Sequence, residues 1–238
     1  MRTIFLSLLT TCVFISATAQ YNNSKTLEGN GKLETRNIPV KSFTELKASG
    51  IYELRLSQGN TESVKIEADE NLQELFTVRN EGSKLVIETE KLNKMENTSL
   101  NVKNKMIVHV TFRTLKNMEL STIGNIKADE SLSFDDLELT NKSIGNVDLK
   151  LTANQINVEN KSVGNLTISG KAQNAVVKNN SVGNFHAGSF VVQTMDINNN
   201  GIGSSEVNAE KELKVKDSFM GKVKNKGTAP TPKKRVVI

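Results

Sequence analysis

The sequence is almost without cysteine: among its 238 residues only Cys12 is one, and it lies in an apolar N-terminal segment. If that segment is removed on export, no cysteine remains, which excludes disulfides, thiol catalysis and cysteine-ligated metals. Aromatic residues are also scarce, with no tryptophan and 2 tyrosines. We therefore expect a core of small aliphatic side chains in layers, held by packing and backbone hydrogen bonds.

The body of the chain also lacks an excess of either charge. The net charge is +5, but six basic residues and no acidic one follow Asp217. Without these six and Arg2, 24 basic residues stand against 26 acidic ones. A nucleic-acid-binding domain would carry a basic stripe with interleaved aromatics, so we expect no nucleic-acid partner. Residues 224–238 are interpreted as a basic, flexible tail, with contact to anionic surfaces as the alternative.

The N-terminus has the features of a secretory signal peptide. Arg2 precedes an apolar run, Ile4–Ile15, and residues 17–19 have the small-x-small form of a cleavage site. This pattern predicts a signal peptide over residues 1–19, cut before Gln20 and followed by an extension over residues 20–35. A membrane anchor is the alternative, but twelve residues are too few to span about 30 Å of hydrocarbon. We expect no transmembrane segment in the mature chain.

One phrase recurs along the chain: NKSIGNVDL at residues 141–149, NKSVGNLTI at 160–168 and NNSVGNFHA at 179–187. The glycines of the whole series are spaced by 21, 19, 19, 20 and 18 residues. They are Gly124, Gly145, Gly164, Gly183, Gly203 and Gly221. A fixed glycine at a period near 20 predicts a solenoid.

Strands are predicted on both sides of each glycine. Apolar residues two and four positions after it flank a polar one, as Val147 and Leu149 flank Asp148. Apolar residues eight and six positions before it alternate in the same way, which is typical of half-buried strands. The residue directly before each glycine is apolar as well, and we expect it to face inward. These residues are Ile123, Ile144, Val163, Val182, Ile202 and Met220.

The glycine and the following asparagine are predicted to form a tight corner, because both tolerate positive φ better than other residues. The candidate site residues are these structural corners. They are Gly124, Asn125, Gly145, Asn146, Gly164, Asn165, Gly183, Asn184, Gly203 and Gly221. Stacked Asn125, Asn146, Asn165 and Asn184 would form one side-chain ladder; Asn141, Asn160, Asn179, Asn199 and Asp217 would form another. The N-x-S motifs at Asn141, Asn160 and Asn179 are then corner residues and not glycosylation sites.

The first half of the chain lacks the repeat. Strand-like runs occur at Phe43–Ala48, Ile51–Leu56, Ser63–Ala68, Lys84–Glu90 and Met106–Phe112. Asn71–Leu75 is predicted to be one helical turn, and Lys91–Lys105 an exposed loop. A solenoid needs a cap, because its first coil is an open edge. We therefore predict an all-β fold, with residues 36–120 as an irregular β cap and residues 121–223 as a β-helix.

The segment FTELKASGIYELRLSQGNTESVKIEADENL (43–72), the strand SKLVIET (83–89) and the serial S-[IV]-G-N units occur in this order. Together they resemble the bacterial head GIN domain family, also called DUF2807, a family of auto-transporter adhesins. The resemblance covers roughly residues 36–223. It implies a right-handed parallel β-helix of pectin-lyase-like type in an exported protein of a Gram-negative envelope, and it supplies no catalytic or ligand residue. Residues 200–204 and 218–222 depart from the repeat, so we expect less regular coils there.

Enzymatic chemistry has little support in the sequence. Sugar-cleaving β-helices place carboxylates from adjacent coils together, but the outward column beside the corners brings no two together. It contains Lys127, Asp148, Thr167, His186, Glu206 and Lys224. The two histidines, His109 and His186, have no partner at metal-ligand spacing, so we expect no catalytic residue, metal or cofactor.

The predicted function is that of a non-enzymatic binding or adhesion module, periplasmic or at the cell surface, with a glycan or protein partner. The first alternative is a structural envelope component that self-associates as a homo-oligomer. The second is a carbohydrate-active β-helix enzyme.

Overall fold

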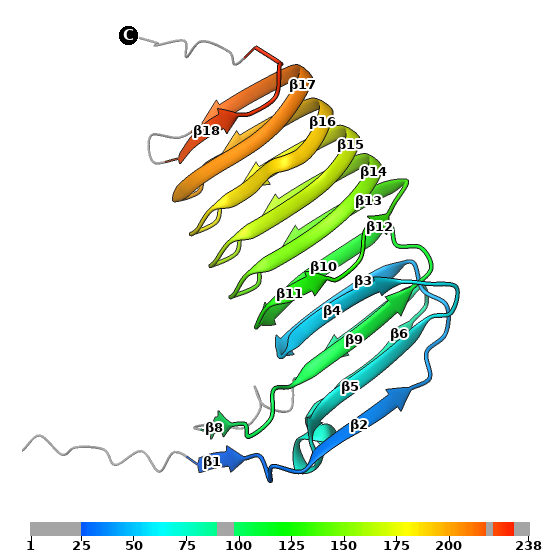
Figure 1. Cartoon of the computed structure of the whole chain (residues 1–238). Helices are drawn as coiled ribbons and strands as arrows, with labels where there is room; N and C mark the ends of the chain where they lie inside the picture. Colours follow the sequence, from blue (N-terminus) through cyan, green and yellow to red (C-terminus); the bar gives the residue numbers. More distant parts are fainter. Residues whose placement is uncertain (1–24, 90–97, 218–220, 231–238) are drawn as a thin grey trace, which may run out of the picture.

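The computed structural model of the chain describes residues 25–89, 98–217 and 221–230. Within these residues the fold is all-β: a mixed sheet of sixteen strands winds round into a nearly closed, barrel-like form, and a two-stranded sheet lies apart (Figure 1). No helix in this part of the chain is long and apolar enough to cross a membrane. The predicted signal peptide lies outside the described residues, as do residues 231–238 of the predicted tail.

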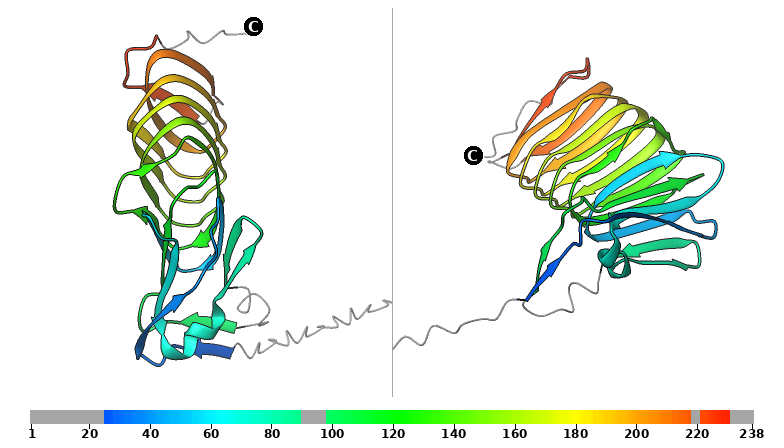
Figure 2. Two further views of the ribbon diagram at one scale, coloured as in Figure 1. Left: turned by 90° about the vertical axis from the view of Figure 1, so that its right-hand side faces the viewer. Right: turned by 60° about the horizontal axis from the view of Figure 1, so that its bottom comes forward.

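The C-terminal part of the fold is a stack of layers, each about 20 residues long. Its strands are β10 (Asn117–Ile123), β11 (Ile126–Ala128), β12 (Leu132–Ser133), β13 (Asp136–Asn141), β14 (Val147–Asn160), β15 (Leu166–Asn179), β16 (Phe185–Asn199), β17 (Gly203–Asp217) and β18 (Gly221–Asn225). Each layer pairs with the next in parallel, so that Ile156 lies beside Ala175 and Ala175 beside Met195. Figure 2 shows the layers end-on, one above another.

The period-two pattern of the sequence builds each layer. In β14, Val147, Leu149 and Leu151 point inward and are buried, and polar residues between them face outward. Two consecutive exposed residues, Asn154 and Gln155, shift the alternation by one position. Ile156 and Val158 beyond them are buried again. The aliphatic residues of every layer therefore meet in one continuous interior.

The stack begins in the first half of the chain. Strands β3 (Glu45–Ile51) and β4 (Glu53–Gln58) pair in parallel with β10 and β11, so strand pairing crosses the boundary predicted at residue 120. Beneath them lie β7 (Lys84–Glu88) and β9 (Ile107–Phe112), also parallel. The last strands are antiparallel: β6 (Thr77–Glu81) on β7, and β5 (Ser63–Asp69) followed by β2 (Leu33–Ile38) on β9. The change to antiparallel pairing ends the stack on this side.

The structure confirms the five strands predicted before residue 115 and the helical turn, which is the 3₁₀ helix η1 (Glu70–Leu75). The loop predicted over Lys91–Lys105 is wrong in part. Residues 90–97 lie outside the described chain, but β8 (Thr98–Asn101) is a strand and pairs in parallel with β1 (Lys25–Glu28). The sequence TSLN is short and mostly polar, so its strand character depends on the partner and not on a hydrophobic pattern.

Candidate functional site

The predicted corner glycines follow one another along one edge of the stack, here called the corner edge. The backbone angle φ is +135° at Gly145, +128° at Gly164 and +136° at Gly183. A Cβ atom on Gly164 would lie 2.2 Å from the backbone oxygen of Gly145 in the neighbouring layer. Such a clash leaves room for glycine alone. At the ends of the series, Gly124 lies over Tyr52, and Gly203 pairs with Gly221 of β18.

The asparagines that follow the glycines form an outer ladder. The side-chain oxygens of Asn125, Asn146 and Asn165 accept hydrogen bonds from the backbone N–H of the next asparagine, at 3.1, 3.2 and 3.0 Å. Ser204 takes the place of a fifth asparagine and donates both its N–H and its hydroxyl to Asn184. The links therefore run mainly from side chain to backbone, with one side-chain amide link from Asn165 to Asn146.

A second, inner ladder is fully buried. The Nδ2 of Asn141 donates to Oδ1 of Asn160 at 3.0 Å, Asn160 to Asn179 at 2.9 Å, and Asn179 to Asn199 at 2.7 Å. Asp217 is in register with Asn199 in the next layer. The three N-x-S asparagines are at most 1% exposed. Their burial supports the interpretation that these motifs are architectural.

The prediction that the residue before each glycine faces inward is wrong. Five such residues are half exposed: Ile123 50%, Ile144 52%, Val163 52%, Val182 51% and Ile202 49%. Met220 lies outside the described residues. The serine one position earlier, such as Ser143 or Ser162, is buried, so period-two alternation turns the aliphatic residue outward. We call these five side chains the aliphatic ridge. At the corner edge, polar groups are inside and apolar groups outside.

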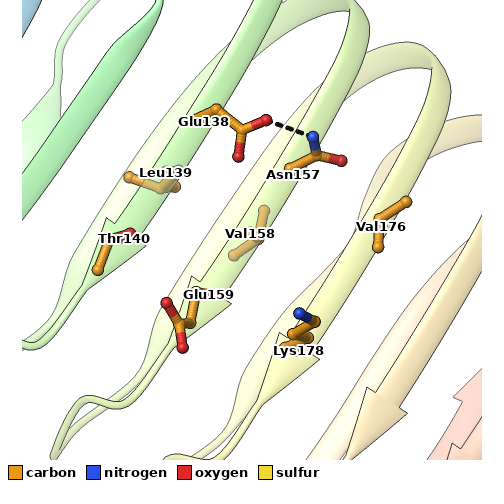
Figure 3. Close-up of a pocket in the computed structure, with 8 residues that line it drawn as sticks. All are labelled: Glu138, Leu139, Thr140, Asn157, Val158, Glu159, Val176 and Lys178. Carbon is orange, nitrogen blue, oxygen red and sulfur yellow. Dashed lines mark hydrogen bonds between the residues drawn. The ribbon is translucent and has the colours of Figure 1, made fainter.

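A pocket of 340 Å³ lies on the outward face of β13, β14 and β15, and we call it the sheet-face pocket (Figure 3). Its outward polar side chains are Glu138, Thr140, Asn157, Glu159 and Lys178. Val176, an apolar side chain that is 41% exposed, ends the row that Glu138 and Asn157 begin, and Thr140, Glu159 and Lys178 form the next row (Figure 3). Asn157 Nδ2 donates a hydrogen bond to Glu138 Oε1. The pocket therefore offers donors, acceptors and both signs of charge beside one exposed apolar side chain.

This pocket brings together two carboxylates that the sequence analysis did not combine, Glu138 and Glu159. The signal was present: a period of 19 places Glu138, Asn157 and Val176 side by side, and Val176 interrupts a polar column. Lys161 lies 2.7 Å from Glu159, and its hydrogen bond lowers the pKa of that carboxyl. A general acid in glycoside hydrolysis needs the opposite, a raised pKa.

The residues first considered for catalysis do not form a site. Asp148, Thr167, His186 and Glu206 do lie in register in one outward column. His109 lies on another wall, 3.2 Å from Glu67, and burial together with Lys65 lowers its pKa. Among the described residues no three histidine, aspartate or glutamate side chains are grouped to hold a metal.

Two other pockets are among those that the described residues line. One of 830 Å³ lies on the wall that carries Thr152, Lys150 and Lys171. The other, of 420 Å³, lies at the end of the aliphatic ridge and is called the end pocket. Its apolar lining includes Ile51, Leu100, Val102 and Ile123.

A family model described as "Putative auto-transporter adhesin, head GIN domain" (DUF2807) matches residues 42–229. The chain belongs to the head GIN domain family. Comparison with curated proteins gives no match. Crystal structures of several other proteins have the same fold as this head GIN protein.

One is a "putative adhesin" from Bacteroides fragilis, 24% identical, with a TM-score of 0.73 over 85% of this chain and 97% of that one. A "putative lipid binding protein" from Parabacteroides distasonis is 16% identical, with a TM-score of 0.58 over 87% of this chain and 98% of that one. A "putative adhesin" from the same species is 20% identical, with a TM-score of 0.52 over 86% and 99%. At these identities the likeness concerns the fold alone.

Proposed function

We propose that this head GIN protein is an exported, non-enzymatic binding module of the bacterial envelope, which presents a rigid surface to a glycan. In this proposal residues 1–19 are a signal peptide and residues 121–223 form a right-handed parallel β-helix. Residues 36–120 cap it, and residues 224–238 form a basic tail whose first residues are held on the stack, since Asn225 ends β18 and Ala229 is buried. The family name and the adhesin neighbours support the adhesion role.

The observation that carries the proposal is the sheet-face pocket. Its side chains project from three strands that are hydrogen-bonded in parallel, so their spacing is fixed before a ligand arrives. Preorganised groups of this kind lose little entropy on binding. A saccharide ring has hydroxyls that suit Glu138, Asn157 and Lys178 and an apolar face that suits Val176. Polar groups held at fixed positions orient a ligand and give its site specificity.

The pocket's polar rim distinguishes a glycan from an acyl chain, which the name of the P. distasonis neighbour would suggest. Charged Glu159 and Lys178 would have to lose water against an acyl chain without gaining hydrogen bonds, and this is costly. Sugar hydroxyls return those hydrogen bonds. We therefore favour a hydroxylated ligand, and a protein partner remains the second candidate.

A glycan array probed with the purified chain and with a Glu138→Ala/Lys178→Ala variant tests this proposal. We expect binding that survives high salt and falls about tenfold or more in the variant, because two hydrogen-bonding partners are lost. A matched control is Lys150→Ala on the neighbouring wall, which should bind like the wild type. Absence of glycan binding, or equal binding by all three proteins, would contradict the proposal.

The enzymatic alternative can be tested with the same material. The presence of Glu138 and Glu159 in one pocket is the observation that favours it. Incubation with polysaccharides, followed by a reducing-end assay, should show no turnover. Turnover that disappears in Glu138→Gln would replace binding with catalysis.

Protease treatment of intact cells tests the location of the protein. A periplasmic chain would be protected from the protease and could not act as a surface adhesin.

A further inference from the structure

The aliphatic ridge is an ordered, exposed apolar line. Its backbone groups are all engaged: Val163 N–H donates to Ser143 O at 3.0 Å, and Gly145 N–H donates to Val163 O at 2.9 Å. Successive ridge residues are joined as parallel bridges from Ile123 to Ile202. With about 4.8 Å between layers, the five side chains extend over about 20 Å. A contiguous apolar line on a protein surface usually marks an interaction site.

We propose that the aliphatic ridge is the interface of a homodimer, in which the ridges of two copies pack antiparallel about a twofold axis at Val163. The period of the ridge supports a second copy as the occupant. With the axis at Val163, every ridge residue meets a ridge residue of the other copy: Val163 meets Val163, Ile144 meets Val182 and Ile123 meets Ile202, so the two apolar lines match over their whole length. A twofold interface of this kind uses the same patch on both copies.

Charges beside the ridge favour the antiparallel orientation. This orientation places Lys127 of one copy opposite Glu206 of the other, and Asp148 opposite His186, with Thr167 facing itself. Within each copy Glu206 is bound by Lys226 at 2.7 Å and Lys127 lies 3.6 Å from Asp129, so the first contact would extend ion pairs that are already present. The like-charged contact between the two Lys161 side chains at the axis is offset, because each has Glu159 at 2.7 Å. A lipid surface would instead favour one sign of charge, whereas both signs flank this ridge.

The end pocket also favours antiparallel packing. It lies beside Ile123, at the opposite end of the ridge from Ile202, and is lined by Ile51, Leu100 and Val102. In an antiparallel pair each pocket receives Ile202 of the other copy, whereas in a parallel pair the two pockets face each other unfilled. The half-exposed ridge offers on the order of 400 Å² per copy, about half of what a standard interface buries. The end pocket and flanking columns would supply the remainder.

Sedimentation analysis of the purified chain tests the proposal. We expect a concentration-dependent dimer whose dissociation constant rises at least about tenfold in Val163→Glu, because a carboxylate would be buried on an apolar contact. The matched control is Val176→Glu, an equally aliphatic exposed position in the sheet-face pocket, which should leave the dimer intact. The inference does not rest on the proposed function: Val176→Glu should impair glycan binding alone, and Val163→Glu dimerisation alone.

Cross-linking tests the orientation. In a Cys12→Ser background, Ile123→Cys mixed with Ile202→Cys should form disulfide-linked dimers on mild oxidation, while Ile123→Cys alone should not. Cross-linking of Ile123→Cys with itself would overturn the antiparallel arrangement. A wild-type chain that stays monomeric at its highest soluble concentration would overturn the dimer. Monomers that bind lipid vesicles, with binding lost in Val163→Glu, would assign the ridge to a membrane surface instead.

Discussion

The two halves of the molecule bury different kinds of polar groups. In the stack, the buried polar side chains are neutral asparagines, serines and a threonine. In the first half, they include two carboxylates, Asp69 and Glu88. Glu88 is 3% exposed and is held by Arg79 at 2.6 Å and Lys47 at 3.5 Å.

The difference follows from the architecture. A repeated layer places like residues on top of one another, and stacked like charges would repel, whereas an amide is both donor and acceptor and can bond its own copy. The non-repeating half meets a different partner at each position, so a charge can be matched once. Substitutions that disturb the backbone or the ladders of the stack should therefore lower the free energy of unfolding most. In the first half, the effect of a substitution on that free energy should depend on pH.

The largest effect is expected from Gly164→Ala on the corner edge. Positive φ and a Cβ placed 2.2 Å from a neighbouring backbone oxygen leave no way to relax. We expect a loss of about 4 kcal/mol in the free energy of unfolding, measured with urea. The control in the first half is Gly82→Ala, where φ is +60° but nothing lies within 4 Å of the added Cβ. It should cost about 1 kcal/mol; equal losses would contradict the steric argument.

The inner ladder should show the next largest effect. Asn160→Ala removes the acceptor of Asn141 Nδ2 and of the Ser162 hydroxyl and the donor to Asn179. Orphaned groups in a dry interior should cost about 3 kcal/mol. Asn165→Ala in the outer ladder, where water can replace the lost bonds, should cost about 1 kcal/mol or less. If both variants lose the same stability, burial is not what makes the inner ladder important.

Repetition explains which features could be predicted. The period of 19 to 21 residues supplies the register of the stack, so the two ladders and the glycine alignment could be expected from the sequence. The outward orientation of Ile144 could not be predicted in this way. An apolar residue is expected to face inward, and only the structure shows that the neighbouring Ser143 takes the inward position. The sheet-face pocket could have been predicted from the sequence. The same register places its side chains next to one another, and Val176 is the apolar residue in an otherwise polar column.

The first half offers no such period. Asp69 is bound by residues more than 30 positions away, Lys103 and Asn104, and no pattern in the sequence links these segments. The strand β8 was missed for the same reason: its pairing with β1 joins residues 73 positions apart. Contacts that occur once, between distant segments, leave no periodic signal.

Among the three main variants, the smallest effect, but the one that separates the two halves most directly, is that of pH on Asp69. Burial alone would raise the pKa of this carboxyl, but the Asn104 side chain and the amides of Asn104, Lys103 and Gly31 together lower it. A pKa below the unfolded value of about 3.9 means that the ionised group stabilises the fold fully above that pH and loses this contribution as the pH falls from there through the lowered pKa of the folded state. Asp69→Asn should therefore cost about 2 kcal/mol at pH 7.

Measured by urea unfolding, this cost should shrink as the pH is lowered below about 4, because the carboxyl of the unfolded chain then binds a proton that the folded chain still excludes. The cost of Asn160→Ala should stay constant over the same range, because no member of the broken contacts titrates. A cost of Asp69→Asn that is equally independent of pH would show that Asp69 acts through shape alone. It would also remove the distinction between a charged first half and a neutral stack.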